Sequence, residues 1–158
     1  KMMDRLKPKS IVVVSSAPQI RYPDCYGIDM AKLEGLVAFR AALELLKDRN
    51  LYHIVDEVYV KCKKQEDLHD KDVVNFVTEI YAPFKPQEIS DKIAELLSSP
   101  EINAEVKIIF QTVEDLHTAC PKNLGDWYFT GDYPTPGGNR VVNRAFMNFY
   151  EGKDARAY

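Results

Sequence analysis

Residues 11–18 have the sequence IVVVSSAP, a short β-branched run closed by turn-forming residues. Continuous apolar character without alternation is typical of a strand buried on both faces, as in a parallel sheet covered by helices. An irregular segment, 19–28, follows, with Pro18, Pro23 and Gly27 as breakers. Loops that leave the carboxyl ends of parallel strands hold the sites of many α/β proteins. The sequence therefore predicts an α/β fold with its chemistry in residues 19–28.

Apolar residues spaced by three and four predict several helices after this segment. Pro83 and Pro86 separate the third predicted helix from the fourth, and a stretch rich in Gly, Pro and aromatic residues, 125–138, precedes the last one. The helices are expected at 36–46, 51–62, 73–81, 89–97 and 142–149, and 153–158 is expected to be a loose tail.

A second strand is predicted at 106–110. Thr112 is expected to cap a short helix, because Asp115 stands three residues on, at the N3 position of a pattern like a capping box. The predicted fold is therefore α/β and helix-rich.

Composition limits the class of protein. The length of 158 residues suits about one domain, and 46% hydrophobic with 28% charged residues is typical of a chain that buries a core. The net charge of −3 gives no general attraction for nucleic acid. No apolar stretch approaches the roughly 20 residues that span a bilayer. We expect neither a nucleic-acid nor a membrane partner.

The cysteines and histidines favour neither a disulfide framework nor a metal site. Cys25, Cys62 and Cys120 stand far apart with no C-x-x-C pair, which favours a reducing, cytoplasmic location. The three histidines fall on separate elements, and none has the i, i+4 partner of a zinc-binding helix. Cys62 lies on the apolar face of its predicted helix and is expected in the core.

Residues 136–140, PGGNR, precede the last predicted helix and have two interpretations. Their backbone N–H groups are candidates to hold a phosphate at the helix N-terminus. Asn139 as an ordinary N-cap explains the same residues, and we favour it. Arg140 and Arg144 share one helix face and are candidates for contact with an anion or a partner surface.

Two motifs resemble one family. Residues 15–30, SSAPQIRYPDCYGIDM, resemble the S-A-P-x-I-R-x-P-x-x-Y-G-I-D-M segment of amidophosphoribosyltransferases. Residues 129–134, FTGDYP, resemble the F-T-G-x-Y-P of that family, and 41–87 looks like an insertion relative to its common form. The resemblance implies the end of a type I phosphoribosyltransferase parallel sheet, followed by a mainly helical C-terminal region. We expect a closing strand and loop in 1–30, a helical region with the insertion in 31–88, and a helix-strand-helix region in 89–158.

The resemblance implies a parent enzyme of purine synthesis. One domain of such enzymes releases ammonia from glutamine, and another uses it with Mg²⁺ to convert phosphoribosylpyrophosphate into phosphoribosylamine. The family's loop for phosphoribosylpyrophosphate, two acidic residues followed by S-I-V-R-G-T, is absent from the chain, as is the glutaminase cysteine. The chain opens with KMMDRLKPKS, a pattern typical of the last turns of a helix. We therefore expect a C-terminal fragment that has no catalytic residues of its own.

The resemblance also implies roles for particular residues. Tyr26 and Asp29 are candidates to line the channel that keeps ammonia from bulk water. Asp29 also precedes Met30, where we expect the first long helix to begin, so an N-cap role is compatible. One branch of the family holds an iron–sulfur cluster, but its cysteine positions correspond here to Asp24, Gly125 and Tyr128. Because a cluster needs about four thiolates, we expect none.

The expected partners follow from the same resemblance. They are the phosphoribosyltransferase core and the glutaminase domain of the same enzyme, in a homo-oligomer to which the apolar faces of the inserted helices, at Leu51 and Val55, would contribute. The alternative is a helical interaction or oligomerisation module that catalyses nothing.

Overall fold

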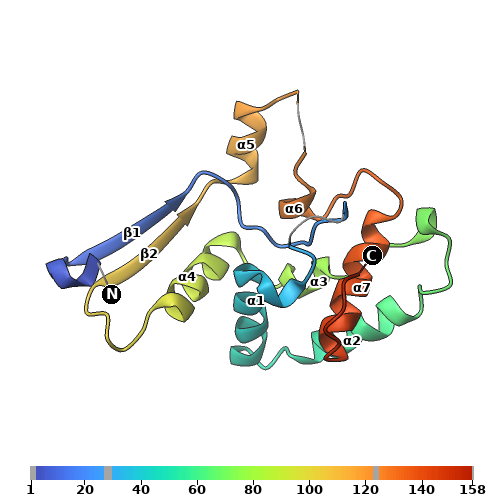
Figure 1. The fold of residues 1–158 in the computed structure, drawn as a ribbon, viewed down its shortest axis with the longest axis horizontal. Helices are drawn as coiled ribbons and strands as arrows, with labels where there is room; N and C mark the ends of the chain where they lie inside the picture. The colour runs from blue at the N-terminus through green and yellow to red at the C-terminus, as the bar shows by residue number, and fades with distance from the viewer. Residues whose placement is uncertain (1–2, 27–29, 123–124, 158) are drawn as a thin grey trace.

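The computed structural model of the chain describes residues 3–26, 30–122 and 125–157. Within these ranges two strands are joined by a run of helices, and more helices follow the second strand (Figure 1). In chain order the elements are η1 (Met3–Leu6), β1 (Ser10–Ser15), η2 (Leu33–Gly35), α1 (Val37–Asp48), α2 (His53–Lys63), η3 (Asp70–Asp72), α3 (Thr78–Tyr81), α4 (Pro86–Leu97), β2 (Glu105–Phe110), α5 (Val113–Ala119), α6 (Trp127–Thr130) and α7 (Gly138–Tyr150).

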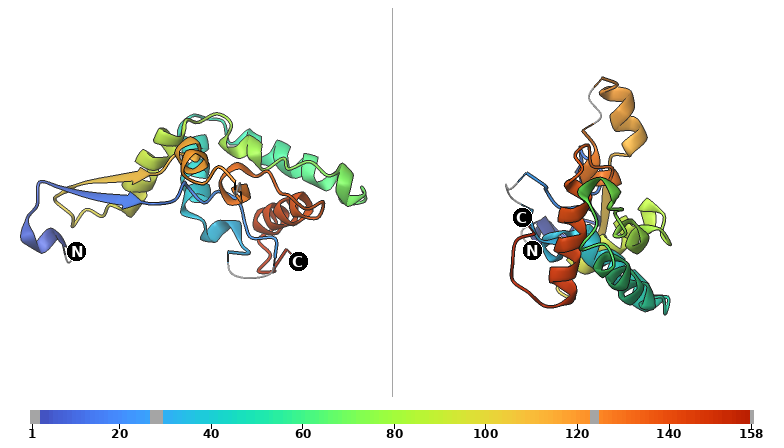
Figure 2. Two further views of the ribbon diagram at one scale, coloured as in Figure 1. Left: turned by 90° about the horizontal axis from the view of Figure 1, so that it is seen from above. Right: turned by 90° about the vertical axis from the view of Figure 1, so that its right-hand side faces the viewer.

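The two strands pair in parallel, with Ser10 opposite Glu105 and Ser15 opposite Phe110. Helix α4 packs against β2 on one side and α1 on the other. The strands extend as an arm from a body of helices, as the view from above shows (Figure 2). The described chain is thus α/β and helix-rich, with a two-stranded parallel sheet, in agreement with the coarse expectation.

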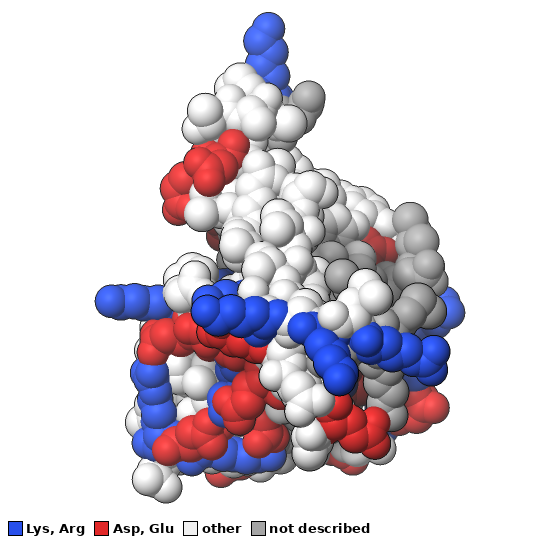
Figure 3. Space-filling view, turned by 90° about the vertical axis from the view of Figure 1, so that its left-hand side faces the viewer, with Lys and Arg blue, Asp and Glu red and all other residues white. Residues whose placement is uncertain are grey.

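The expectation that the first strand is buried on both faces is wrong. Val12 and Val13 are each 50% exposed and Val14 is 70% exposed, although successive side chains point to opposite faces. Among the described residues β1 pairs only with β2, so its other edge has no strand beside it. Figure 3, which views the molecule from the end where the strands lie, shows a band of uncharged atoms between a charged lower part and α5. The sequence predicted the apolar character of β1 correctly, but the described residues leave these side chains exposed.

The core lies in the helical body. Phe39 of α1 contacts Phe146 and Phe149 of α7 edge-to-face, with ring centroids 6.3 and 4.9 Å apart. Ile80 of α3 and Ile89 of α4 are fully buried in the same cluster. The predicted helices at 36–46, 51–62, 89–97 and 142–149 are confirmed as α1, α2, α4 and α7.

The predicted helix at 73–81 is shorter than expected. Only Thr78–Tyr81 is helical, because side-chain oxygens accept hydrogen bonds from the backbone N–H groups that precede it. Gln65 Oε1 accepts from Val74 N at 2.8 Å, and Asn75 Oδ1 accepts from Val77 N at 3.1 Å. These local bonds compete with the helical ladder.

The last helix begins earlier than Asn139 as its N-cap would require. Helix α7 starts at Gly138, so Asn139 is its second residue rather than its N-cap, and Asn139 Nδ2 donates to Val73 O at 2.8 Å. A Cβ on Gly138 would lie 2.4 Å from Tyr133 Cβ. The glycine therefore lets Tyr133 pack on the start of the helix.

The predicted loose tail is packed against the body. Lys32 forms an ion pair with Asp154, and Asn148 Nδ2 donates to Ala155 O at 3.2 Å. Ala157 is buried in the core. The short polar sequence of the tail gave no sign of these contacts.

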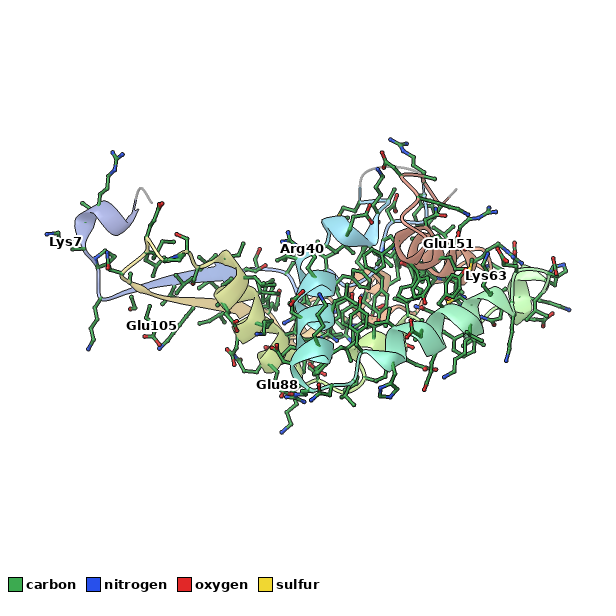
Figure 4. The ribbon with its side chains drawn as sticks, turned by 90° about the horizontal axis from the view of Figure 1, so that it is seen from below. Lys7, Arg40, Lys63, Glu88, Glu105 and Glu151 are labelled. Atoms are coloured by element: carbon green, nitrogen blue, oxygen red, sulfur yellow. The ribbon has the colours of Figure 1, made fainter. Side chains whose placement is uncertain are left out.

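Helix α2 turns its apolar face inward. Val55, Val58 and Cys62 are buried, as expected for Cys62, and the helix packs against α7. On the same helix, Lys63 forms an ion pair with Glu151 at 3.1 Å (Figure 4). Val55 is therefore unavailable as the oligomer contact that the amphipathic pattern suggested, and Leu51 is partly buried against the same core.

Candidate functional site

The loop after β1 is held by the segment that carries the second motif. The backbone N–H groups of Arg21 and Tyr22 both donate to Tyr128 O, at 2.8 and 3.1 Å. The hydroxyl of Tyr133 donates to Pro23 O. Two segments about a hundred residues apart in the sequence therefore form one packed unit beyond the carboxyl ends of the strands (Figure 1).

Gly131 closes this unit with a left-handed backbone. Its φ is 82°, and a Cβ there would lie 2.7 Å from Asn75 Nδ2 and 3.0 Å from Tyr22 Cζ. Asn75 Nδ2 donates to Gly131 O at 3.2 Å. Only a residue without a side chain allows both the conformation and the close approach.

Asp24 is a buried carboxylate within this unit. It is 1% exposed, and Tyr128 Oη donates to its Oδ1 at 3.0 Å. Burial raises the pKa of Tyr128, and the bond to Asp24 adds to this rise. Burial likewise raises the pKa of Tyr22 and of Tyr133. These phenols therefore stay protonated to a higher pH than an exposed tyrosine would, and Tyr128 serves Asp24 as a hydrogen-bond donor.

The two channel candidates have different outcomes. Tyr26 is 55% exposed, and its ring meets Trp127 of α6 edge-on with centroids 6.0 Å apart. Asp29 lies outside the described residues. The N-cap interpretation of Asp29 is wrong in its premise, because the first long helix begins at Val37 with Leu36 as N-cap.

A cavity of about 390 Å³ opens at the carboxyl ends of both strands. Phe110 and Gln111 at the end of β2 line it, as do Thr130 of α6 and Ser90 of α4. The apolar part of the lining comprises Pro18, Pro86, Ile109, Phe110, Val113 and Phe129. Carboxyl ends of parallel strands are where open α/β sheets hold ligands.

Gln19 and Arg21 supply the directed polar groups of this cavity. Gln19 is 4% exposed, and its Nε2 donates to Pro86 O and Ser90 Oγ, both at 2.8 Å. Its Oε1 accepts from Arg21 Nε and Nη2 at 3.2 and 2.8 Å. Sequence reasoning placed the chemistry in 19–28 but missed this pair, whose only signal was a basic residue in the loop after a parallel strand.

The two arginines expected to meet an anion or partner differ. Arg140 is bound within the chain, because its guanidinium pairs with Asp70 and donates to the backbone oxygens of Glu66 and Leu68. Arg140 therefore fixes the loop after α2. Arg144 is exposed on α7 and stays a candidate contact.

Ligands for a metal ion are not gathered in the described chain. Among residues 3–26, 30–122 and 125–157, no three His, Cys, Asp or Glu side chains form a group that could hold one. His117 instead meets Asp126, with Nε2 and Oδ2 2.8 Å apart. Cys25 is half-buried, and burial raises the pKa of its thiol.

Comparisons with protein-family models, curated proteins and solved structures give no match to the chain. No helix in its described part is both long and apolar enough to cross a membrane.

Proposed function

We propose that this chain is the C-terminal part of an amidophosphoribosyltransferase, which uses ammonia from glutamine to make phosphoribosylamine from phosphoribosylpyrophosphate. In this proposal β1 belongs to a type I phosphoribosyltransferase sheet. The chain contributes no catalytic residue of its own, and the parent enzyme acts in the cytoplasm as a homo-oligomer.

One observation carries the proposal. The resemblance aligns Asp24 and Tyr128 with positions that jointly hold a cluster in one branch of the family, so these positions should be neighbours in space. Tyr128 Oη is 3.0 Å from Asp24 Oδ1, although the residues are 104 apart in the sequence. The contact supports the alignment independently of the matching letters. Neither side chain is a thiolate, and the proposal includes no iron–sulfur cluster.

The exposed apolar faces of β1 give further support. Val12, Val13 and Val14 are suited to a strand flanked on both sides, as in a covered parallel sheet. The described residues offer no grouped acidic ligands for Mg²⁺, so the proposal assigns that ion to the rest of the parent enzyme.

Tyr26 and Trp127 provide the part of the ammonia path that the described residues can form. Their edge-to-face rings make an aromatic wall at Tyr26, three residues before Asp29 in the sequence. An apolar wall helps to keep ammonia from water, where it would be protonated. The proposal therefore assigns Tyr26 and Asp29 to transfer rather than to either half-reaction.

The test uses the full-length protein that contains this chain. Glutamine hydrolysis, glutamine-dependent synthesis and ammonia-dependent synthesis of phosphoribosylamine are measured separately for wild type, Tyr26→Ala and Asp29→Ala. Both variants are expected to lose glutamine-dependent synthesis while the other two activities survive. Tyr52→Ala, an exposed tyrosine before α2, is the matched control. If the wild-type protein makes no phosphoribosylamine, the proposal fails.

The alternative is a non-catalytic interaction module, and the exposed strand β1 is the observation that favours it. An apolar edge strand suits pairing with another polypeptide whether or not an enzyme results. The same assays separate the two functions, because a module of this kind forms no phosphoribosylamine in its natural context.

A further inference from the structure

The cavity at the carboxyl ends of β1 and β2 contains a cation that the described chain leaves without an acidic partner. Arg21 Nε and Nη2 both donate to the neutral oxygen Gln19 Oε1. No carboxylate among the described residues forms an ion pair with Arg21. A guanidinium has five N–H donors, so three remain after the bonds to Gln19.

The guanidinium of Arg21 is also held in a fixed orientation. Gln19 is buried and anchored by two bonds of its own, to Pro86 O and Ser90 Oγ. The ring of Tyr81 lies under the guanidinium, with Cζ 5.4 Å from the ring centroid. Tyr81 is in turn fixed, because its hydroxyl donates to Arg21 O at 2.6 Å. An oriented guanidinium loses little freedom when it binds a planar or tetrahedral anion.

The rest of the cavity suits an apolar group. Phe110 and Phe129 line it together with prolines, and its volume of about 390 Å³ falls within the range of roughly 300–1,000 Å³ typical of small-molecule sites. The other charge in the lining is Glu114, which is exposed on α5 and therefore screened by solvent.

We propose that this cavity binds a small molecule that carries one carboxylate or phosphate group beside an apolar body, with the anionic group on Arg21. Arginine forms paired hydrogen bonds with both kinds of anion. The site does not depend on the function proposed above, and a protein without any transferase activity would retain it.

The test is a titration of the chain with two probes, benzoate and inorganic phosphate, at constant ionic strength. Two-dimensional NMR follows the backbone amides and the Arg21 Nε–H signal. Saturable shifts confined to Arg21, Ser90 and Thr112 with either probe are expected. Binding of benzoate alone assigns the site to carboxylates with an apolar body, and binding of phosphate alone assigns it to phosphate groups.

Three variants test the role of the guanidinium. Arg21→Gln should weaken binding by roughly tenfold or more, since a hydrogen-bonded charge is lost. Arg40→Gln removes an exposed arginine from α1 and should change nothing, and Glu114→Gln should bind at least as well as wild type. The proposal is overturned if neither probe shifts these signals in the wild-type chain. Equal binding by folded Arg21→Gln would overturn it as well.

Discussion

Gly138 and Gly35 differ in what surrounds them. A side chain at Gly138 would meet Tyr133, whereas a Cβ at Gly35 has nothing within 4 Å, and neither residue has a positive φ. At the scale of single residues, close approaches of this kind are invisible in the sequence, because PGG predicts a turn wherever it stands.

Gly138→Ala is therefore expected to lower the free energy of unfolding by about 1–3 kcal/mol, as overpacking does. Gly35→Ala should stay within ~0.5 kcal/mol of wild type. Urea unfolding followed by circular dichroism measures both. Equal values for the two variants would mean that Tyr133 does not pack on the start of α7.

The three cysteines differ in exposure, and their reactivity should follow. Burial raises the pKa of Cys62 to about 12, with a smaller contribution from Glu79, so its thiol stays protonated at pH 8. Cys120 is exposed and Cys25 half-buried. Because the thiolate is the reactive form, we expect Cys120 to react first with a thiol reagent, then Cys25.

Cys62 should react only after denaturant is added, and Cys120→Ser should remove the fast phase. Since folding raises the pKa of Cys62, its contribution to stability is present below the ordinary thiol pKa and is lost as the pH rises above about 9. Rapid labelling of Cys62 in the native chain would contradict its place in the core.

At the scale of elements, the sequence predicted the positions of the helices well. It predicted less well which other segments pack against each element. The spacing of apolar residues located α1, α2, α4 and α7, and Thr112 caps α5 as expected, accepting from Asp115 N at 3.0 Å. The same kind of spacing overextended α3, because the side chains of Gln65, nine residues before Val74, and of Asn75, two residues before Val77, accept hydrogen bonds from backbone N–H groups ahead of the helix, and apolar spacing does not report such bonds. The sequence located the candidate site only as the loop 19–28. The residues that contact this loop are 81, 90 and 128–133, and they lie far from it in the sequence.

The exposed strand β1 gives the prediction at this scale. Val14→Lys should leave the free energy of unfolding within ~0.5 kcal/mol of the wild-type value, because the side chain at this position is already exposed. It should also reduce association of the chain with itself, since a charge on an edge strand opposes pairing. Analytical ultracentrifugation over a range of concentrations measures the association.

Ile108→Lys on β2 is the matched variant, because Ile108 is buried against the core. It should destabilise the chain strongly by burying an unpaired charge. Loss of stability in Val14→Lys comparable to that of Ile108→Lys would show that β1 is covered in solution.

At the scale of the whole molecule, residues 19–26 and 126–133 depend on each other for their hydrogen bonds and packing. Asp24 is buried with Tyr128 as a donor, and the amides of Arg21 and Tyr22 bond to the backbone of the same tyrosine. Tyr128→Phe removes one donor from a buried carboxylate, which costs about 1–3 kcal/mol. Tyr26→Phe removes a hydroxyl from an exposed ring and should be nearly neutral.

Hydrogen exchange then shows whether the loss of the Tyr128 hydroxyl from residues 126–133 also destabilises the backbone of residues 19–26. In Tyr128→Phe the amides of Arg21 and Tyr22 should exchange faster, while amides of α2 should change only as far as global stability falls. If those two amides keep their protection and stability is unchanged, the two motif segments are held independently. In that case the Asp24–Tyr128 contact would no longer support the family alignment, and the proposed function would rest on the matching letters and the exposed apolar faces of β1.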